Sequence, residues 1–417
     1  FNTAILPGLT NWESSSKFFA YFKPHASYPA VLGELLCAGL NVMGFDWIAS
    51  PACTELEVIV LDWLAKFLNL PAKFLNVHDG PGGSVIQGSA GEAAIVVLLA
   101  AIIRKQNSAK LGENTSRDNL VVFSSDQTHA IITKACMILG IPNHHIVKTQ
   151  AEHTYALQAS ALREAIDAEI ALGRVPLAVV ATTGTTSSCA FDPLGEIGEV
   201  CQEYGNLWLH IDAAYGGAYA CLPELSHKFQ GVDRADSFVV NCHKKLLCPF
   251  DIAAMYVADR RPVLTALSLQ PEYLKNAASE SGAVVDYEHW QLPLGRRFRA
   301  LKLWFVMRRF GTDGLRDHVR MGMKHSTYFA KLLALHPDLF ELVVPVSLSL
   351  VCFRLKDRSE EDMKRFLDNI KATGECFVIH TKLDGRLVVR VAFGGSEQSP
   401  ADVQNAYQVI YTAATNL

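Results

Sequence analysis

Hydrophobic and polar positions follow two rhythms along the chain from about Ser89 onward. Short, wholly apolar runs of strand length alternate with longer segments of helical periodicity. The predicted strands are 119–125, 176–184, 207–215, 236–244 and 251–258, and the predicted helices among them are 126–140, 161–173 and 192–205. Strands that are apolar on both faces and separated by helices predict an α/β fold with a mostly parallel, helix-covered sheet. Ligands of such sheets bind at the carboxyl ends of the strands.

A different pattern follows a long helical segment, 297–336. Strand-like runs in 340–355 and 376–393, a turn at Asp384–Gly385 and helices at 359–374 and after Ser399 predict a smaller α+β domain. We therefore divide the chain into a large domain, 1–311, and a small C-terminal domain, 312–417. Segment 269–285 is rich in Ala, Ser and Gly without apolar periodicity, which predicts a mobile loop.

Composition excludes several classes of protein. The 38 basic and 42 acidic residues are mixed along the chain, so no basic stripe is present that could bind nucleic acid. The longest apolar run, 93–103, is shorter than the roughly 18 residues that a membrane span requires. Ten cysteines without C-x-x-C pairs fit the reducing cytoplasm. Because the sequence starts at Phe1 rather than methionine, we expect an upstream segment to be missing.

The most specific chemistry lies at the ends of two predicted strands. Asp212 ends one apolar run, and His243 and Lys244 end another. An aspartate and a lysine so placed could hold the two ends of a pyridinium ring, the lysine as an imine and the acid at the ring nitrogen, as pyridoxal phosphate chemistry requires. Taken singly, Lys244 could instead begin a solvated loop, and Asp212 could cap a turn.

Three further features lie on the same predicted edge. Ser89 and Glu92 form a capping-box pattern at the start of an apolar helix, where the backbone N–H groups of Ser89, Ala90 and Gly91 would face an anion such as a phosphate. His129 falls in the first turn of the helix predicted from Asp126, where the helix dipole favours a neutral imidazole that could stack on a cofactor.

Thr186 and Asp192 follow a predicted strand, and Asp192 is also the expected N-cap of the next helix. The loop TTGTTSS could alternatively be an ordinary polar connection.

The chain resembles the pyridoxal-phosphate-dependent aromatic L-amino acid decarboxylases, which include dopa, tyrosine, tryptophan and histidine decarboxylases. The resemblance runs from the first residues to the last helix and rests on strings such as ILPGLTNW, GFDWIASPACTELE, VIQGSAGEA, SSDQTHA, HIDAAYGG, N-x-HK, PEYLKN and DYEHWQLPLGRRFRALKLWFV. It implies the fold type I, aspartate aminotransferase-like architecture, pyridoxal 5'-phosphate as cofactor, and a homodimer with active sites at the subunit interface.

The resemblance also implies roles for individual residues. Lys244 corresponds to the imine lysine with His243 beside it, Asp212 to the partner of the ring nitrogen, Ala214 to a packing contact under the ring and His129 to the stacking histidine. Phosphate-binding positions are Ala90, Gly91 and Asn241; Thr186 and Asp192 belong to the loop near the cofactor; and Trp12, Tyr21, Phe22, Phe45, His129 and Gly295 would contact the aromatic amino acid, some of them from the partner subunit.

The product depends on two positions. Tyr273 stands where amine-forming members carry a tyrosine that supports protonation of the carbanion, and His129 is the residue that these members share. The resemblance therefore implies decarboxylation to an amine. An aromatic acetaldehyde synthase remains the alternative, and Gly295 leaves room for an indole or a catechol without choosing between them.

The sequence departs from the family pattern around the imine lysine. Cys242 and Lys245 replace a proline and a large aromatic residue, Gly91 replaces a serine, and Lys23 replaces a proline. Loss of a hydroxyl bond to the phosphate would weaken cofactor binding by about 1.5–3 kcal/mol. A cofactor-binding protein with impaired turnover is therefore a further alternative.

Overall fold

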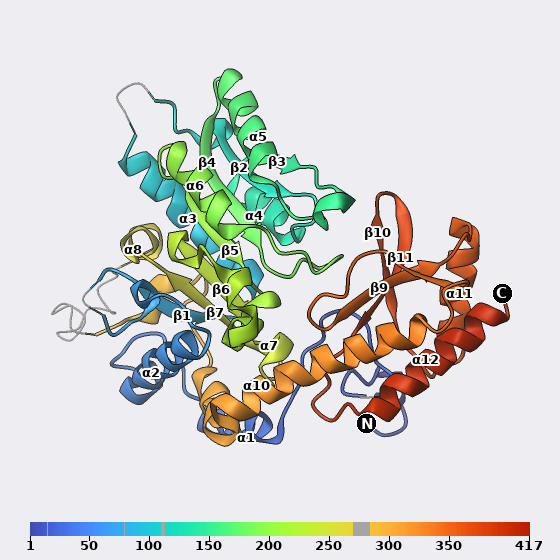
Figure 1. Ribbon diagram of the computed structural model, residues 1–417. Helices are drawn as coiled ribbons and strands as arrows, with labels where there is room; N and C mark the ends of the chain where they lie inside the picture. Colours follow the sequence, from blue (N-terminus) through green and yellow to red (C-terminus); the bar gives the residue numbers. More distant parts are fainter. Residues whose placement is uncertain (15, 79, 110–112, 270–283) are drawn as a thin grey trace. The chain divides into compact units, whose positions relative to one another are not determined.

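The computed structural model describes residues 1–417 except 15, 79, 110–112 and 270–283 (Figure 1). The chain forms two compact units: a larger unit, Ser27–Arg316, and a smaller unit, Phe1–Ala26 together with Asp317–Leu417. The N-terminal segment thus groups with the C-terminal part of the chain, and the units change at 316 rather than at 311. The division into a large and a small functional domain stays a prediction.

The larger unit is built on a seven-stranded sheet in the order β1-β7-β6-β5-β4-β2-β3. Its strands are β1 (Gly83–Gln87), β2 (Leu120–Ser125), β3 (Asn143–Val147), β4 (Val175–Thr182), β5 (Trp208–Asp212), β6 (Ser237–Asn241) and β7 (Ala253–Val257). Pairs β2–β3, β2–β4, β4–β5 and β5–β6 are parallel, whereas β7 pairs antiparallel with both β6 and β1. Strand β1 therefore runs in the same direction as β6, and the predicted mostly parallel α/β sheet is confirmed.

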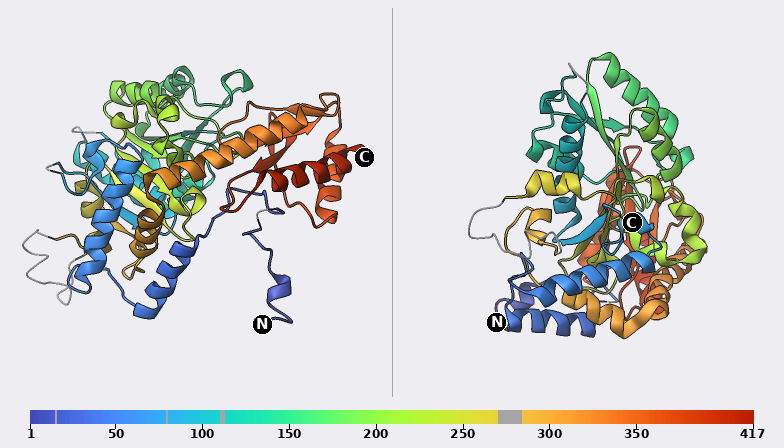
Figure 2. Two further views of the ribbon diagram at one scale, coloured as in Figure 1. Left: turned by 60° about the horizontal axis from the view of Figure 1, so that its bottom comes forward. Right: turned by 90° about the vertical axis from the view of Figure 1, so that its left-hand side faces the viewer.

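Helices cover both faces of this sheet (Figures 1 and 2). The helices of the larger unit are α1 (Tyr28–Leu40), α2 (Pro51–Phe67), α3 (Ala90–Asn107), α4 (Ile131–Leu139), α5 (Ala159–Ala171), α6 (Leu194–Glu203), α7 (Cys242–Lys245), α8 (Arg261–Leu267) and the start of α10 (Ala300–Leu333). The apolar face of α3 packs with alternate residues of the strands, such as Val122, Val180 and Val239, in one core. Every residue of β1, β2, β5, β6 and β7 is buried, which explains their unbroken apolar character.

The smaller unit contains a four-stranded antiparallel sheet in the order β10-β11-β9-β8. Its elements are β8 (Phe340–Leu342), β9 (Leu350–Leu355), α11 (Glu360–Ala372), β10 (Ile379–Leu383), β11 (Arg386–Ala392), α12 (Pro400–Thr415) and the second part of α10. Ser359 and Ser399 begin α11 and α12 with capping boxes. The predicted hairpin turn is confirmed, since Asp384 and Gly385 both have positive φ, 50° and 76°.

The structure also bears on the predictions about membrane spans, cysteines and the loop 269–285. No helix among the described residues is long and apolar enough to span a membrane. All ten cysteines are buried, and none of them forms a disulfide bond within the described structure. The predicted loop 269–285 lies almost wholly outside the described residues.

Candidate active site

The carboxyl ends of four strands bring the predicted site residues to one edge of the sheet. Asp212, the last residue of β5, lies opposite Thr182, the last residue of β4. Asn241 ends β6 and is level with Gln87, the last residue of β1, because both pair with Ala253 of β7. The helices α3 and α7 begin directly beyond these ends, as expected for a ligand-binding edge.

Asp212 is held firmly at this edge. Its side chain is only 6% exposed, and one carboxylate oxygen accepts the Ala214 N–H at 3.0 Å. Its carbonyl accepts the Thr183 N–H, and the Ala214 carbonyl accepts the Asn241 N–H at 3.1 Å. The tip of β5 is thus tied to the ends of both neighbouring strands, which fixes the direction of the carboxylate.

Asp212 and Lys244 both lie within electrostatic range of His129. Burial lowers the pKa of the His129 imidazole, Asp212 raises it and Lys244 lowers it. The structure therefore brings together an acid, an amine and an imidazole from β5, α7 and the loop after β2. Lys244 itself is half-buried, although α7 as a whole is packed into the unit.

The position of His129 differs from the sequence prediction. Helix α4 begins at Ile131, not near Asp126, so His129 lies before the helix instead of in its first turn. Its Nδ1 accepts the backbone N–H of Ile131 at 3.2 Å, which places the proton of a neutral imidazole on Nε2. The predicted neutral state is thus favoured by this bond rather than by a place inside the helix.

The start of α3 fits an anion. Ser89 is the N-cap, and its hydroxyl accepts the Glu92 N–H at 3.2 Å, which confirms the predicted cap. The Glu92 carboxylate accepts the Gly88 N–H instead of completing the box at Ser89. The N–H groups of Ala90 and Gly91 belong to the first turn, where a helix offers them no internal acceptor.

Close packing explains why a glycine stands at position 91. A Cβ at this position would lie 2.8 Å from the Ile131 side chain. The isoleucine that opens α4 therefore occupies the space that a serine side chain would need. Gly91 and Ile131 therefore pack the start of α3 closely against the start of α4, next to His129.

Asp192 does not cap helix α6, as the sequence predicted, but binds two backbone N–H groups elsewhere. The N-cap of α6 is Pro193, so that prediction was wrong. The two Asp192 carboxylate oxygens accept the N–H groups of Leu157 at 2.8 Å and Thr182 at 2.7 Å. Because the carboxylate is wholly buried, its pKa is raised to about 6.

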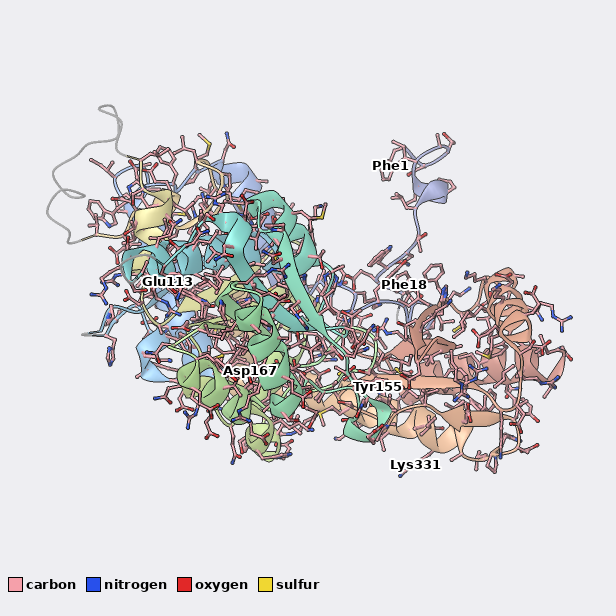
Figure 3. The ribbon with its side chains drawn as sticks, turned by 90° about the horizontal axis from the view of Figure 1, so that it is seen from above. Phe1, Phe18, Glu113, Tyr155, Asp167 and Lys331 are labelled. Atoms are coloured by element: carbon pink, nitrogen blue, oxygen red, sulfur yellow. The ribbon has the colours of Figure 1, made fainter. Side chains whose placement is uncertain are left out.

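Asp192 therefore ties the end of β4 to the segment that follows Tyr155, a buried residue labelled in Figure 3. Thr186 lies exposed in the loop between β4 and Asp192. Their predicted contacts with the cofactor stay predictions.

The residues that flank Lys244 show how the unusual sequence is accommodated. The Nδ1 of His243 accepts the Ile252 N–H at 3.1 Å, and burial lowers the pKa of His243 to about 4. Cys242 is buried. Lys245 is only 1% exposed, its amine lies 5.9 Å from the centre of the Tyr219 ring, and burial lowers its pKa to about 7.

The predicted substrate-contacting residues belong to both units. Phe45 lies in the larger unit, and its carbonyl accepts the Glu288 N–H at 2.8 Å. A Cβ on Gly295 would meet only the Met43 sulfur, at 3.6 Å, so the space beside Gly295 is open.

Trp12, Tyr21 and Phe22 belong to the smaller unit. Trp12 stacks on Tyr21, and Phe22 lies under the Arg390 guanidinium. Tyr273 lies outside the described residues.

Sequence reasoning overlooked Ile131 and His210. His210 could have been found from strand alternation, since it lies two residues before Asp212 and points to the same face. The contact between Ile131 and Gly91 carries no such pattern, because it joins two helices.

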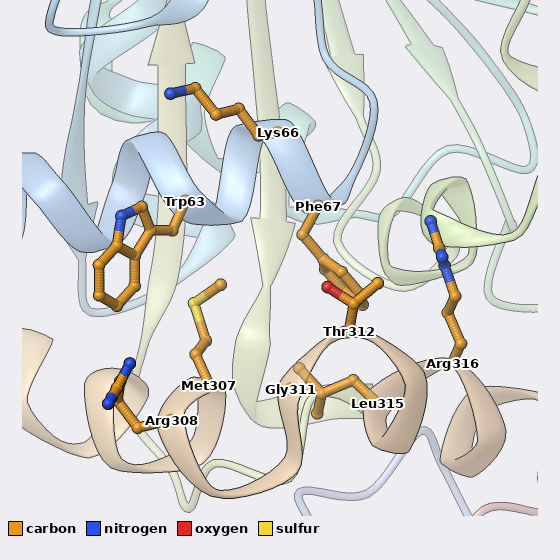
Figure 4. A pocket seen from close by; sticks show the side chains of 9 residues that line it. All are labelled: Trp63, Lys66, Phe67, Met307, Arg308, Gly311, Thr312, Leu315 and Arg316. Atoms are coloured by element: carbon orange, nitrogen blue, oxygen red, sulfur yellow. The ribbon is translucent and has the colours of Figure 1, made fainter.

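A cavity of about 550 Å³ lies elsewhere in the larger unit, between α2 and α10 (Figure 4). It is lined by Trp63, Lys66, Phe67, Met307, Arg308, Gly311, Thr312, Leu315 and Arg316. The picture shows the Lys66 amine turned away from Arg308. None of the predicted site residues lines this cavity.

Comparison with known proteins agrees with the geometry of the edge. The family model described as the pyridoxal-dependent decarboxylase conserved domain matches residues 1–356. Phenylacetaldehyde synthase of Arabidopsis thaliana is 44% identical over 99% of this chain and 84% of its own length, and tyrosine decarboxylase 2 of Narcissus pseudonarcissus is 45% identical over 99% and 83%. A crystal structure of Oryza sativa TDC with PLP and tryptamine superposes with a TM-score of 0.94 at 40% identity, covering 100% of this chain and 86% of that one. The chain belongs to the family of pyridoxal-dependent decarboxylases, carboxy-lyases that use pyridoxal phosphate.

Proposed function

We propose that the protein decarboxylates an aromatic L-amino acid of the tyrosine, dopa or tryptophan type to the corresponding amine and carbon dioxide. The observation that carries this proposal is the gathering of His129, Asp212 and Lys244 at one sheet edge, next to the free N–H groups of α3. The names of the similar proteins support an aromatic substrate.

The residues of the edge fit pyridoxal phosphate by their donor and acceptor chemistry. The first turn of α3, at Ala90 and Gly91, offers N–H donors to a phosphate, and the carboxylate of Asp212 suits a protonated ring nitrogen. When bound, the cofactor supplies an aldehyde that links to amines and a ring that withdraws the electron pair of a broken bond. Lys244 offers the amine for the resting linkage, and the neutral imidazole of His129 offers a flat surface without adding a charge.

The chain's own residues would then direct the chemistry. A fixed Asp212 carboxylate stabilises positive charge at its position without reorganisation, which is the main electrostatic contribution that a preorganised site makes. The half-buried Lys244 can exchange its link for the substrate amine. Tyr273 is proposed to deliver a proton to the substrate carbon after carbon dioxide leaves.

Association into a homodimer is supported by the surface of α1. This helix exposes a row of large apolar side chains, namely Tyr28, Leu32, Leu35, Leu36 and Leu40, which are 83%, 53%, 63%, 48% and 58% exposed. Patches of this kind mark interaction surfaces. We propose that a second copy covers it and that residues of both copies complete the substrate pocket. The ten free thiols support a cytoplasmic location.

The decisive experiment is a substrate panel with added cofactor. Tyrosine, dopa, tryptophan, phenylalanine and histidine are each tested for release of carbon dioxide, amine, aldehyde and peroxide. The proposal expects carbon dioxide and amine in equal amounts from at least one aromatic acid. Aldehyde with equimolar peroxide would establish the acetaldehyde synthase instead, and cofactor binding without carbon dioxide from any acid would establish impaired turnover.

Substitution of the loop tyrosine tests the choice of product. In Tyr273→Phe the hydroxyl that delivers the proton is absent, so aldehyde and peroxide should increase at the expense of amine by roughly the 10²-fold or more that a positioned proton donor contributes. Tyr204→Phe is the control, because the Tyr204 hydroxyl binds Asp167 on the surface. An unchanged ratio of amine to peroxide in Tyr273→Phe would remove the tyrosine from this role.

A further inference from the structure

A buried histidine shares the strand face of Asp212. Side chains of a strand alternate, so Trp208, His210 and Asp212 of β5 point to the same face. His210 is 1% exposed and lies between Val180 of β4 and Ser237 of β6. Helix α3 covers this face, where its Arg104 lies over the Trp208 ring at 4.4 Å.

The hydrogen bonds around Ser237 determine where the His210 proton lies. The Trp208 indole N–H can only donate, and it donates to the Ser237 hydroxyl oxygen at 2.8 Å. The same oxygen lies 2.8 Å from the His210 Nδ1. Among the described residues, these are the two partners of that hydroxyl, so its own proton is satisfied only if it is donated to Nδ1. The neutral imidazole consequently carries its proton on Nε2.

Burial keeps this imidazole neutral. It lowers the pKa of His210 to about 4, although the neighbouring Asp212 carboxylate acts in the opposite direction. Within the described part of the chain, the Nε2 atom is buried and has no hydrogen-bond partner. A buried donor of this kind costs about 1–3 kcal/mol, so its retention beside the site calls for a function.

We propose that His210 is a positioning residue for Asp212: its Nε2–H, set by the relay from Trp208 through Ser237, supplies donor polarity that stabilises the Asp212 carboxylate in its ionised form. The inference rests on the proposed role of Asp212 at the cofactor ring nitrogen. A carboxylate so stabilised keeps the ring nitrogen protonated. His210 acts through Asp212 and does not itself touch the reacting atoms.

The test compares His210→Phe with His210→Gln in the holoenzyme. Phenylalanine keeps a ring of similar size but removes the donor, whereas glutamine restores an N–H near the Nε2 position. His210→Phe should weaken pyridoxal phosphate binding roughly tenfold, as expected for the loss of one donor near a charge. The pH midpoint of the cofactor's visible absorbance should move upward by about one unit, because a less positive ring lets the lysine nitrogen hold its proton more tightly. Glutamine should restore both values toward the wild type.

His144→Phe is the matched control. His144 is likewise a strand histidine whose pKa is lowered by burial, and both of its ring nitrogens contact hydroxyl groups, those of Ser124 and Thr133. A folded His210→Phe protein with wild-type affinity and absorbance midpoint would overturn the proposal, as would equal shifts in His144→Phe.

If His210→Phe does not fold, histidine ¹⁵N NMR of the wild-type holoenzyme decides, with the His210 signals identified from the His210→Gln spectrum. The expected result is a protonated Nε2 and an unprotonated Nδ1; a protonated Nδ1 would contradict the relay. Failure of the proposed function is seen separately, because the wild type would then release no amine in the substrate panel, whereas the affinity and the absorbance midpoint of the cofactor are measured without substrate.

Discussion

The two sheets of the protein differ in where their strands end. In the seven-stranded sheet, β1, β2, β4, β5 and β6 all end on the same edge. In the four-stranded sheet every pair is antiparallel, so neighbouring strands end on opposite edges. The first arrangement concentrates N–H donors, carboxylates and amines in one place, and the second distributes them.

Burial separates the two sheets as well. The central strands of the seven-stranded sheet are buried at every residue, whereas β10 has exposed residues, His380 and Lys382, at alternate positions. The strands β5 and β6 therefore expose no charged side chain, while β10 places Lys382 in solvent, although Arg354 of β9 and Arg390 of β11 are buried. Substitutions of similar chemistry should have very different effects in the two places.

The largest difference is expected between two lysines. Lys244→Ala removes the amine at the parallel edge, so activity should fall on the order of 10³-fold or more and the visible absorbance of the linked cofactor should vanish. Lys382→Ala, on exposed β10, should leave turnover and spectrum unchanged. Absorption spectra and carbon dioxide release check both variants. Retention of absorbance and turnover by Lys244→Ala would exclude Lys244 as the linked residue.

A smaller effect is expected at Lys245, where removal of the charge should increase the stability of the protein. Burial lowers its pKa from 10.5 to about 7, so the neutral amine's contribution to stability is complete above pH 10.5 and is lost as the pH falls toward 7. Lys245→Met keeps a long side chain without this charge. It should raise the free energy of unfolding at pH 7 by about 2–4 kcal/mol and abolish the pH dependence between 7 and 10.5.

Urea unfolding at several pH values measures this effect, and Lys382→Met serves as the exposed control. Equal stability of Lys245→Met and the wild type at pH 7 would show that the buried amine is fully compensated by its surroundings. The surroundings of Lys245 in α7 would then stabilise its charged amine as well as water does.

The smallest effect is expected at the hairpin turn of the antiparallel sheet. Gly385 has a φ of 76°, and a Cβ there would meet no atom within 4 Å. Gly385→Ala should therefore cost about 1 kcal/mol of stability through backbone strain alone. Kinetic constants should stay at the wild-type values. A thermal unfolding curve together with an activity assay checks this, and altered kinetics would mean that the two sheets are not independent.

Patterns within one element were predictable from the sequence. Apolar runs predicted β2, β4, β5, β6 and β7 but not β1 or β3, and Ser89 was recognisable as a cap because the chemistry of a helix start is local. Asp212 and Lys244 could be placed near one edge because the carboxyl ends of parallel strands share it, although Lys244 lies in α7 and not, as predicted, at the end of a strand 236–244.

Features that depend on contacts distant in sequence were not predictable. Asp192 looked like a cap because it precedes a helix, but its oxygens accept N–H groups from Leu157 and Thr182, which no local pattern indicates. The start of α4 was placed too early, because polar residues before Ile131 form a turn in which the Thr128 hydroxyl binds the Ser125 N–H. Burial of Lys245 was likewise invisible in a pair of adjacent lysines.

Strand β7 has a consequence for what the edge can hold. Inserted between β1 and β6, it separates the start of α3, beyond β1, from α7 with Lys244, beyond β6, by two strand spacings, roughly 10 Å. This distance suits a ligand whose anionic group binds the N–H groups of α3 while its reactive carbon lies near the Lys244 amine. The spacing depends on the backbone of β7, so changes of its buried side chains that preserve the packing of the core would leave this distance unchanged.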